Sequence, residues 1–113
     1  MLLENGETVH IMTQRMFEQD MRRHFIGEIV RSSDAAILVE GYEFMFVQGV
    51  NEYMRQGDKQ CRVFGLCESR HIIDLIPEQV NVDDIAYKNE EHGLVVTDGK
   101  SFKIHIHEFG MLR

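Results

Sequence analysis

The sequence lacks the features that mark membrane, secreted and familiar catalytic chains. None of its apolar runs approaches the roughly 18 residues of a membrane span. The first residues, Met-Leu-Leu-Glu-Asn-Gly-Glu, have neither the basic nor the long apolar region of a secretion signal. No Cys-x-x-Cys pair, His-Glu-x-x-His motif, Ser-His-Asp spacing or phosphate-binding glycine loop occurs. We therefore expect no membrane association and no common reaction centre.

Positive charge is also scarce. The 12 Lys and Arg residues stand against 19 Asp and Glu residues, which gives a net charge of −7. Nucleic-acid affinity depends on clustered Lys and Arg, and the one basic stretch is Met21-Arg22-Arg23-His24. The composition therefore predicts no nucleic-acid partner.

Cysteine is limited to Cys61 and Cys67. If the residues between them form one strand, the two lie roughly 20 Å apart, whereas a disulfide needs Cα atoms within about 7 Å. We expect free thiols that pack as small apolar side chains in the core. Free thiols are typical of a reducing compartment, which predicts a cytoplasmic protein.

The strongest pattern that is present is the run over residues 35–47, which is dense in β-branched and aromatic side chains. Tyr42, Phe44 and Phe46 recur at period two and share one face, while apolar residues also occupy the other face. Apolar side chains on both faces predict a central strand. Gly41, with no side chain to pack, predicts a bend or bulge in it.

The remaining elements are expected around this strand in a single domain over residues 1–113. Asn5-Gly6 predicts either a terminal hairpin or a loose tail over residues 1–12. Thr13 as N-cap, with Met16, Phe17 and Met21 on one face, predicts a helix over 13–24. The other expected strands lie at 25–31, 62–67, 71–76, 94–97 and 100–107. We also expect a loop at 48–59 and a helical turn near 83–87, and Pro77 should end the strand that precedes it. The prediction is an α+β fold, with an N-terminal helix and about six mostly antiparallel strands over 25–109 in a bent sheet or small barrel.

One constellation of side chains has metal-binding chemistry. Asp98-Gly99 predicts a two-residue hairpin turn in which Thr97 faces Lys100. Continued past Gly93, this register places position 92 opposite 105 and position 90 opposite 107. It would gather Glu90, His92, His105 and His107 on one face, a ligand set that suits Zn or Fe. The alternative is that pairing ends near Leu94, with the histidines on a solvated outer face.

Several short stretches resemble a small family of uncharacterised bacterial proteins of about this length. The resemblance implies a compact α+β domain and no particular activity. The stretches are Met16-Phe17-Glu18, Met21-Arg22-Arg23-His24-Phe25-Ile26-Gly27, Gly41-Tyr42-Glu43-Phe44, Leu75-Ile76-Pro77, Val96-Thr97-Asp98-Gly99 with Phe102, and Glu108-Phe109-Gly110.

These observations predict a small cytoplasmic binding or interaction module that needs no cofactor and has no catalytic activity. Apolar strand faces often continue into a partner, so we expect a homo-oligomer. One alternative is a metal-dependent enzyme that uses the C-terminal histidines. Another is a small-ligand pocket near Tyr42, Phe44 and Tyr53.

Overall fold

The computed structural model describes residues 2–15, 17, 19, 21–67, 70–91 and 93–106, and the regular secondary structure of these residues is β-strand apart from one short 3₁₀ helix. The chain divides into two compact units, Met1–Ile76 and Pro77–Arg113. The expected single domain over 1–113 stays a prediction.

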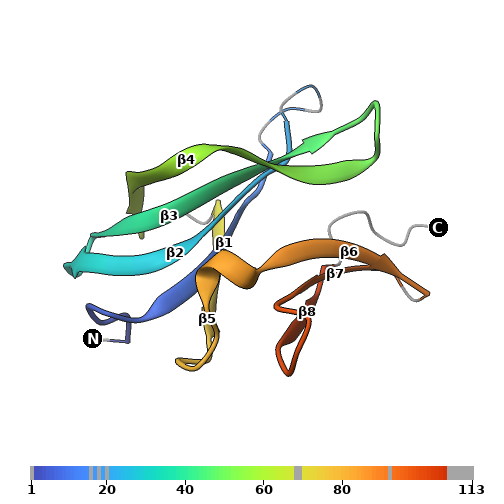
Figure 1. Cartoon of the computed structure of the whole chain (residues 1–113). Helices are drawn as coiled ribbons and strands as arrows, with labels where there is room; N and C mark the ends of the chain where they lie inside the picture. Colours follow the sequence, from blue (N-terminus) through green and yellow to red (C-terminus); the bar gives the residue numbers. More distant parts are fainter. Residues whose placement is uncertain are drawn as a thin grey trace. The chain divides into compact units, whose positions relative to one another are not determined.

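The first unit is one five-stranded antiparallel sheet with the spatial order β4-β3-β2-β1-β5 (Figure 1). Strands β1 to β4 pair in sequence, and β5 returns to pair with the free side of β1. The sheet edges are therefore β4 and β5. The bounds are β1 Thr8–Thr13, β2 Arg23–Ser32, β3 Ala36–Val47, β4 Glu52–Gly65 and β5 His71–Ile76.

The second unit is a three-stranded antiparallel sheet of order β6-β7-β8, preceded by the short 3₁₀ helix η1. The side chain of Asn81 caps η1 by accepting the N–H of Asp83 at 2.9 Å. This element confirms the expected helical turn and places it slightly earlier in the chain. The bounds are η1 Val82–Asp84, β6 Ala86–Glu90, β7 Gly93–Thr97 and β8 Lys103–His105.

The predicted helix over 13–24 is wrong, and with it the α+β fold class. Thr13 is the last residue of β1, where it faces Arg23 of β2 and His71 of β5. Phe17 and Met21, which were expected to pack against the core, are 59% and 48% exposed. A short amphipathic segment gains most of its helical stability by burying its apolar face. The described residues between β1 and β2 bury too little apolar surface to stabilise a helix, and none of them is helical.

The prediction for residues 35–47 is confirmed. Strand β3 lies between β2 and β4, and its register with β4 shifts between Gly41 and Glu43. At the shift Tyr42 alone stands opposite residues 57–59, and Gly57 has a φ of 75°. The bulge therefore lies at Gly41, as expected, and its extra residues come from β4.

The predicted loop over 48–59 is wrong beyond Asn51. Residues 52–59 belong to β4, which pairs with β3 along its whole length apart from the bulge. Their polar side chains suggested a loop, but most of them are exposed on an edge strand. Edge positions do not need apolar side chains, because pairing there depends on the backbone of the neighbouring strand.

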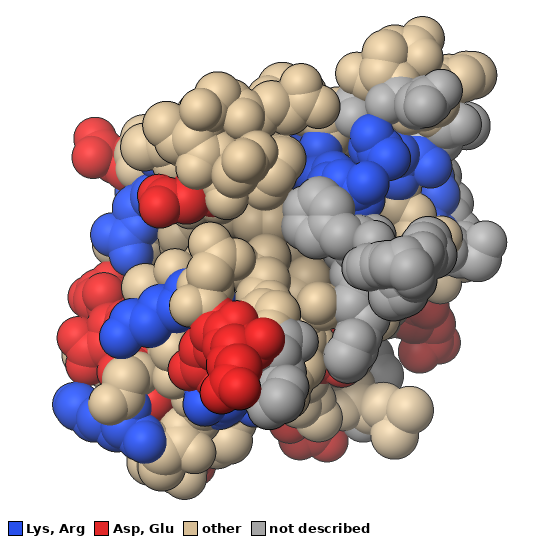
Figure 2. All heavy atoms as spheres, turned by 90° about the vertical axis from the view of Figure 1, so that its right-hand side faces the viewer, with Lys and Arg blue, Asp and Glu red and all other residues tan. Residues whose placement is uncertain are grey.

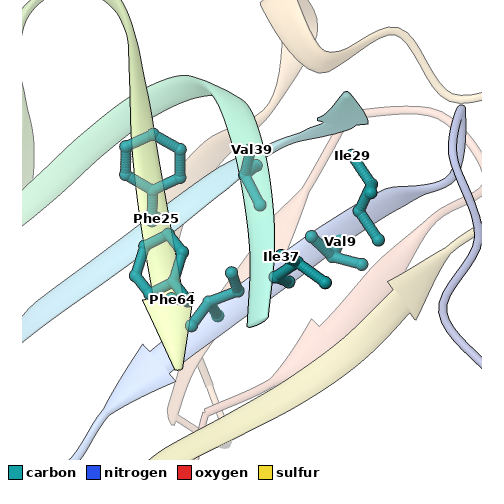
Figure 3. Packing of buried hydrophobic residues seen from close by; sticks show 7 residues of the cluster. Val9, Phe25, Ile29, Ile37, Val39 and Phe64 are labelled. Atoms are coloured by element: carbon teal, nitrogen blue, oxygen red, sulfur yellow. The ribbon is translucent and has the colours of Figure 1, made fainter. Parts of the chain in front are cut away.

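The core of the first unit lies on the odd-numbered face of β1, β2 and β3. Figure 3 shows residues of this cluster, with the rings of Phe25 and Phe64 close to each other; their centroids are 5.3 Å apart. The full set of buried members is Val9, Ile11, Phe25, Ile29, Ile37, Val39 and Phe64. Burial of such side chains contributes about 1.5–3 kcal/mol each relative to exposure, so this face holds the sheet together.

The sheet is curled, because its two edges approach each other at one end. Phe64 of β4 and His71 of β5 make an edge-to-face contact with ring centroids 5.4 Å apart. This contact joins strands that are four places apart in the spatial order. The apolar cluster lies on the concave side of this sheet. The predicted single bent sheet over 25–109 is wrong, because the described strands form two separate sheets and the first of them includes β1.

Candidate functional site

Both cysteines are free thiols, as expected, but neither lies in the core. Cys61 is on the edge strand β4 and Cys67 follows it, and both side chains are exposed. The expectation that they fill core space is wrong. An edge strand has a solvent-facing side at every second residue, so a small apolar residue there need not be buried.

The predicted aromatic site at Tyr42, Phe44 and Tyr53 lies on one face of the β3–β4 pair. Phe44 and Tyr53 are only 5% and 6% exposed. The ring of Tyr53 stacks on His24 with centroids 4.4 Å apart. The guanidinium of Arg55 lies 3.8 Å from the centre of the Tyr42 ring. Protein groups occupy these ring faces, and ligand binding at the three aromatic residues stays a prediction.

The C-terminal histidine cluster rests on a register that the structure contradicts. Val95 pairs with His105 and Thr97 pairs with Lys103, a displacement of three residues from the expected pairing. Glu90 pairs with Gly93 across the β6–β7 turn, and its carboxylate accepts a 2.9 Å hydrogen bond from the Lys103 ammonium. This neighbouring positive charge holds the pKa of Glu90 below its usual value.

Two of the four predicted ligands, His92 and His107, lie outside the described residues, so the metal site as a whole stays a prediction. Within the ranges that the structure describes, no group of three or more His, Cys, Asp or Glu side chains could hold a metal ion. The register change therefore removes the reason for expecting the four to meet.

The turn between β7 and β8 explains the register. The Asp98 carboxylate accepts the backbone N–H groups of Lys100 at 2.9 Å and Phe102 at 3.1 Å. The Thr97 hydroxyl donates to the carbonyl of Phe102 at 2.6 Å and accepts the N–H of Gly99 at 3.0 Å. These side chains stabilise a five-residue connection over 98–102 in place of a two-residue turn. The bound N–H groups, that of Lys100 foremost, lower the pKa of Asp98.

Two buried histidines form a polar contact that the sequence did not reveal. His10 and His24 are 0% and 1% exposed, and Nε2 of His10 lies 3.1 Å from Nδ1 of His24. Nδ1 of His10 lies 3.9 Å from a carboxylate oxygen of Asp74 on β5. The two histidines are 14 residues apart in the chain, and the pairing of β1 with β2 brings them together. The position of His10 between Val9 and Ile11 was the one sequence signal of burial.

Asp74 makes folding stability depend on pH at the acid end. Its interaction with the His10 imidazole lowers its pKa from the ordinary 3.8, against an opposing effect of partial burial. A lowered folded-state pKa contributes stability above the ordinary value, and that contribution is lost as the pH falls through the folded value. We expect Asp74→Asn to lower the free energy of unfolding by under about 1 kcal/mol near neutral pH, because the carboxylate is half-exposed.

The measurement is urea unfolding of wild type and Asp74→Asn at a series of pH values from neutral down to below the ordinary pKa. The difference between the two proteins should shrink toward zero below that value. Parallel curves at every pH would contradict the assignment.

Several other charged side chains of the described residues form ion pairs. Glu43, 8% exposed, accepts hydrogen bonds from Arg62 at 2.9 Å and Arg23 at 3.4 Å. On the face drawn in Figure 2, Lys and Arg side chains lie among Asp and Glu side chains. This arrangement gives the drawn face charges of both signs. Charge alone therefore does not single out a binding site there.

The strongest candidate site is an apolar groove at the margin of the first unit's core, which we call the leucine groove. Its volume is about 520 Å³, within the range of small-molecule sites. Leu2 and Leu75 are 91% and 53% exposed there. The lining residues are Leu2, Leu3, Ser33, Asp34, Leu66, Ile73 and Leu75.

Four separate segments meet to form the leucine groove. Leu3, Leu66 and Ile73 pack against the buried cluster, so the floor of the groove is continuous with the core. Leu66 follows β4, and its N–H donates to the carbonyl of Ala35 at 2.7 Å, which ties it to the β2–β3 turn. Curling of the sheet then brings β5 to the same place, because β5 is the other edge.

The N-terminal segment is fixed beside the groove by its turn. The N–H of Gly6 donates to the carbonyl of Ile29 at 2.7 Å, and the N–H of Ile29 donates to the carbonyl of Glu7 at 2.8 Å. The hydroxyl of Ser32 donates to the side-chain oxygen of Asn5 at 3.2 Å. Residues 1–12 were expected to form either a hairpin or a loose tail. Instead, residues 8–13 form β1, which pairs with β2 and β5.

The β2–β3 turn carries the polar side of the groove. The Ser33 hydroxyl oxygen accepts the N–H groups of Ala35 and Ala36, both at 3.2 Å, and the hydroxyl contacts the carbonyl oxygen of Ala36 at 3.4 Å. These bonds occupy Ser33 within its own turn. Asp34, next in the chain, has an exposed side chain, and among the described residues it is the one charged side chain of the lining.

Comparison with known proteins brings no further assignment: no family model, no curated protein and no solved structure matches the chain. The resemblance to a small bacterial family stays a prediction. The assignment of the leucine groove therefore depends on its own geometry.

Among the described residues, no helix is long and apolar enough to cross a bilayer.

Proposed function

We propose that this chain is a small binding module, with no reaction of its own, whose first unit binds an apolar small molecule in the leucine groove. The observation that supports the proposal is the groove itself, about 520 Å³ of space with five leucine and isoleucine side chains in its lining. Binding sites for small molecules are typically concave and mostly apolar, with few polar groups. The groove has this composition.

Exposure of the lining side chains supports the same conclusion. Leu2 and Leu75 are more than half exposed, although they line a groove in which Leu3, Leu66 and Ile73 pack against the buried cluster. Covering apolar surface is worth about 25 cal/mol per Å² removed from water. A ligand seated there would gain free energy without the protein having to open its core.

We expect Leu75→Glu to weaken binding of a neutral apolar probe, Nile red, about tenfold, because a carboxylate at the rim loses solvation when the groove fills. The matched control is Ile72→Glu. Ile72 is 40% exposed on the opposite face of β5 and does not line the groove. The measurement is a fluorescence titration of wild type and both variants. Equal affinities for the two variants, or no saturable binding to wild type, would contradict the proposal.

We also propose that the module forms a homo-oligomer in a reducing cytoplasm, with a partner that is not nucleic acid. Exposed apolar residues on the edge strand, Val63 at 64% and Met54 at 46%, support self-association. The exposed free thiols of Cys61 and Cys67 support the compartment. The net charge of −7 supports a partner other than nucleic acid.

Light scattering coupled to size-exclusion chromatography measures the self-association. We expect a mass above that of the monomer for wild type and a shift toward monomer for Val63→Lys, because a charge at that position opposes pairing of edge strands. A monomeric wild type at high protein concentration would contradict the proposal.

A further inference from the structure

We propose that the leucine groove selects amphiphiles with a cationic head group, such as a primary alkylammonium ion. This inference rests on the proposed function and adds the ligand class. The apolar lining accepts a hydrocarbon chain, and within the part of the chain that the structure describes Asp34 provides the one charge of the lining. A ligand with an apolar body and a positive end matches both features.

The two polar side chains of the groove, Ser33 and Asp34, differ in whether they are available to contact a ligand. The Ser33 hydroxyl already contacts three backbone groups of its own turn. It would have to leave that turn to serve as the main polar contact. The carboxylate of Asp34 is exposed at the groove. Asp34 therefore determines which sign of charge the site prefers.

The position of the charge is also suited to an ammonium group. An exposed carboxylate attracts a cation without the large desolvation cost of a buried ion pair. The head group can stay hydrated beside Asp34 while its alkyl chain lies over Leu66, Ile73 and Leu75. A carboxylate head group in the same place would be repelled by Asp34.

The experiment compares three probes of equal chain length, decylammonium, decanol and decanoate, each below its micellar concentration. Their affinities are measured by displacement of Nile red from wild type, Asp34→Asn and Asp58→Asn. Asp58→Asn removes the same charge from an exposed residue of β4 that does not line the groove. It therefore controls for the general effect of an acidic protein on cations.

We expect wild type and Asp58→Asn to bind decylammonium about fivefold more tightly than decanol, and decanoate most weakly. In Asp34→Asn the preference for decylammonium should fall to within about twofold, with the affinity for decanol unchanged. High salt should reduce the preference in wild type.

Three results would overturn the inference. Equal binding of the three probes to wild type, or the same head-group preference in Asp34→Asn and Asp58→Asn, would show that Asp34 does not select the ligand, while groove binding would stand. If none of the three probes displaces Nile red and Nile red itself does not saturate, the proposed function fails together with the inference.

Discussion

Gly41→Ala is expected to prevent the first unit from folding, or to lower its free energy of unfolding by more than about 4 kcal/mol. Gly41 and Gly27 face each other in the β2–β3 register. A Cβ built on Gly41 falls on the backbone carbonyl of Ile26 and against Cα of Gly27, closer than 3.0 Å to both. These are backbone atoms in the middle of the sheet, so the two strands would have to separate. Absence of a side chain at both positions is what allows this close approach.

Circular dichroism and urea unfolding measure the effect of Gly41→Ala, and Gly27→Ala should behave in the same way. A Cβ on Gly27 meets the carbonyl of Glu40 in the facing strand. The matched control is Gly49→Ala in the β3–β4 turn, where a Cβ meets nothing within 4 Å. The control should change stability by no more than about 0.5 kcal/mol. A folded Gly41→Ala protein of near wild-type stability would refute the β2–β3 register.

The second large effect is expected at the buried histidines. His24→Ala should lower the free energy of unfolding by about 3–5 kcal/mol, the range for truncating a buried ring. His24 is 1% exposed and contacts both the His10 ring and the Tyr53 ring. Its removal takes away ring packing and also the polar partner that lies 3.1 Å from Nε2 of His10. Both losses act in the same direction.

A double-mutant cycle separates the pair from simple packing. His10→Ala, His24→Ala and the double variant are unfolded in urea, and the coupling between the two positions is calculated. We expect the double variant to be more stable than the sum of the single losses by about 1–2 kcal/mol, because each single variant leaves a buried nitrogen with a lost partner. The control is His105→Ala on the exposed side of β8, which should have little effect. Additive losses would show that the contact between the rings contributes nothing of its own.

The sequence was sufficient for the strands whose apolar residues alternate. The strand predicted at 71–76 is β5, and the run at 35–47 is β3 with its bulge at Gly41. The sequence failed at Thr13 and in β4. Thr13 followed by mixed polar and apolar residues has the local pattern of a helix start, while β4 has the polar composition of a loop. Pairing with neighbouring strands decided the structure at Thr13 and in β4. The sequence of a single segment does not encode that pairing.

The candidate site was beyond sequence reasoning for a related reason. Leu3, Leu66 and Leu75 all line the leucine groove. Leu3 lies near the start of the first unit's sequence, whereas Leu66 and Leu75 lie near its end. None of them belongs to a motif, and each by itself is an ordinary apolar residue. The predicted histidine cluster, in contrast, depended on a register, which the side chains of Thr97 and Asp98 displaced by three residues.

The sequence by itself determined the acidic charge of the protein, its unpaired thiols and the positions of its most apolar strands. These properties are additive or local: charge is a sum over residues, and period-two alternation acts within one segment. The tertiary structure alone decided the all-β class, the strand registers, the contact between His10 and His24 and the leucine groove. Those features arise from hydrogen bonding and sheet curvature between residues far apart in the chain, and the free energy that selects among such pairings belongs to the whole sheet.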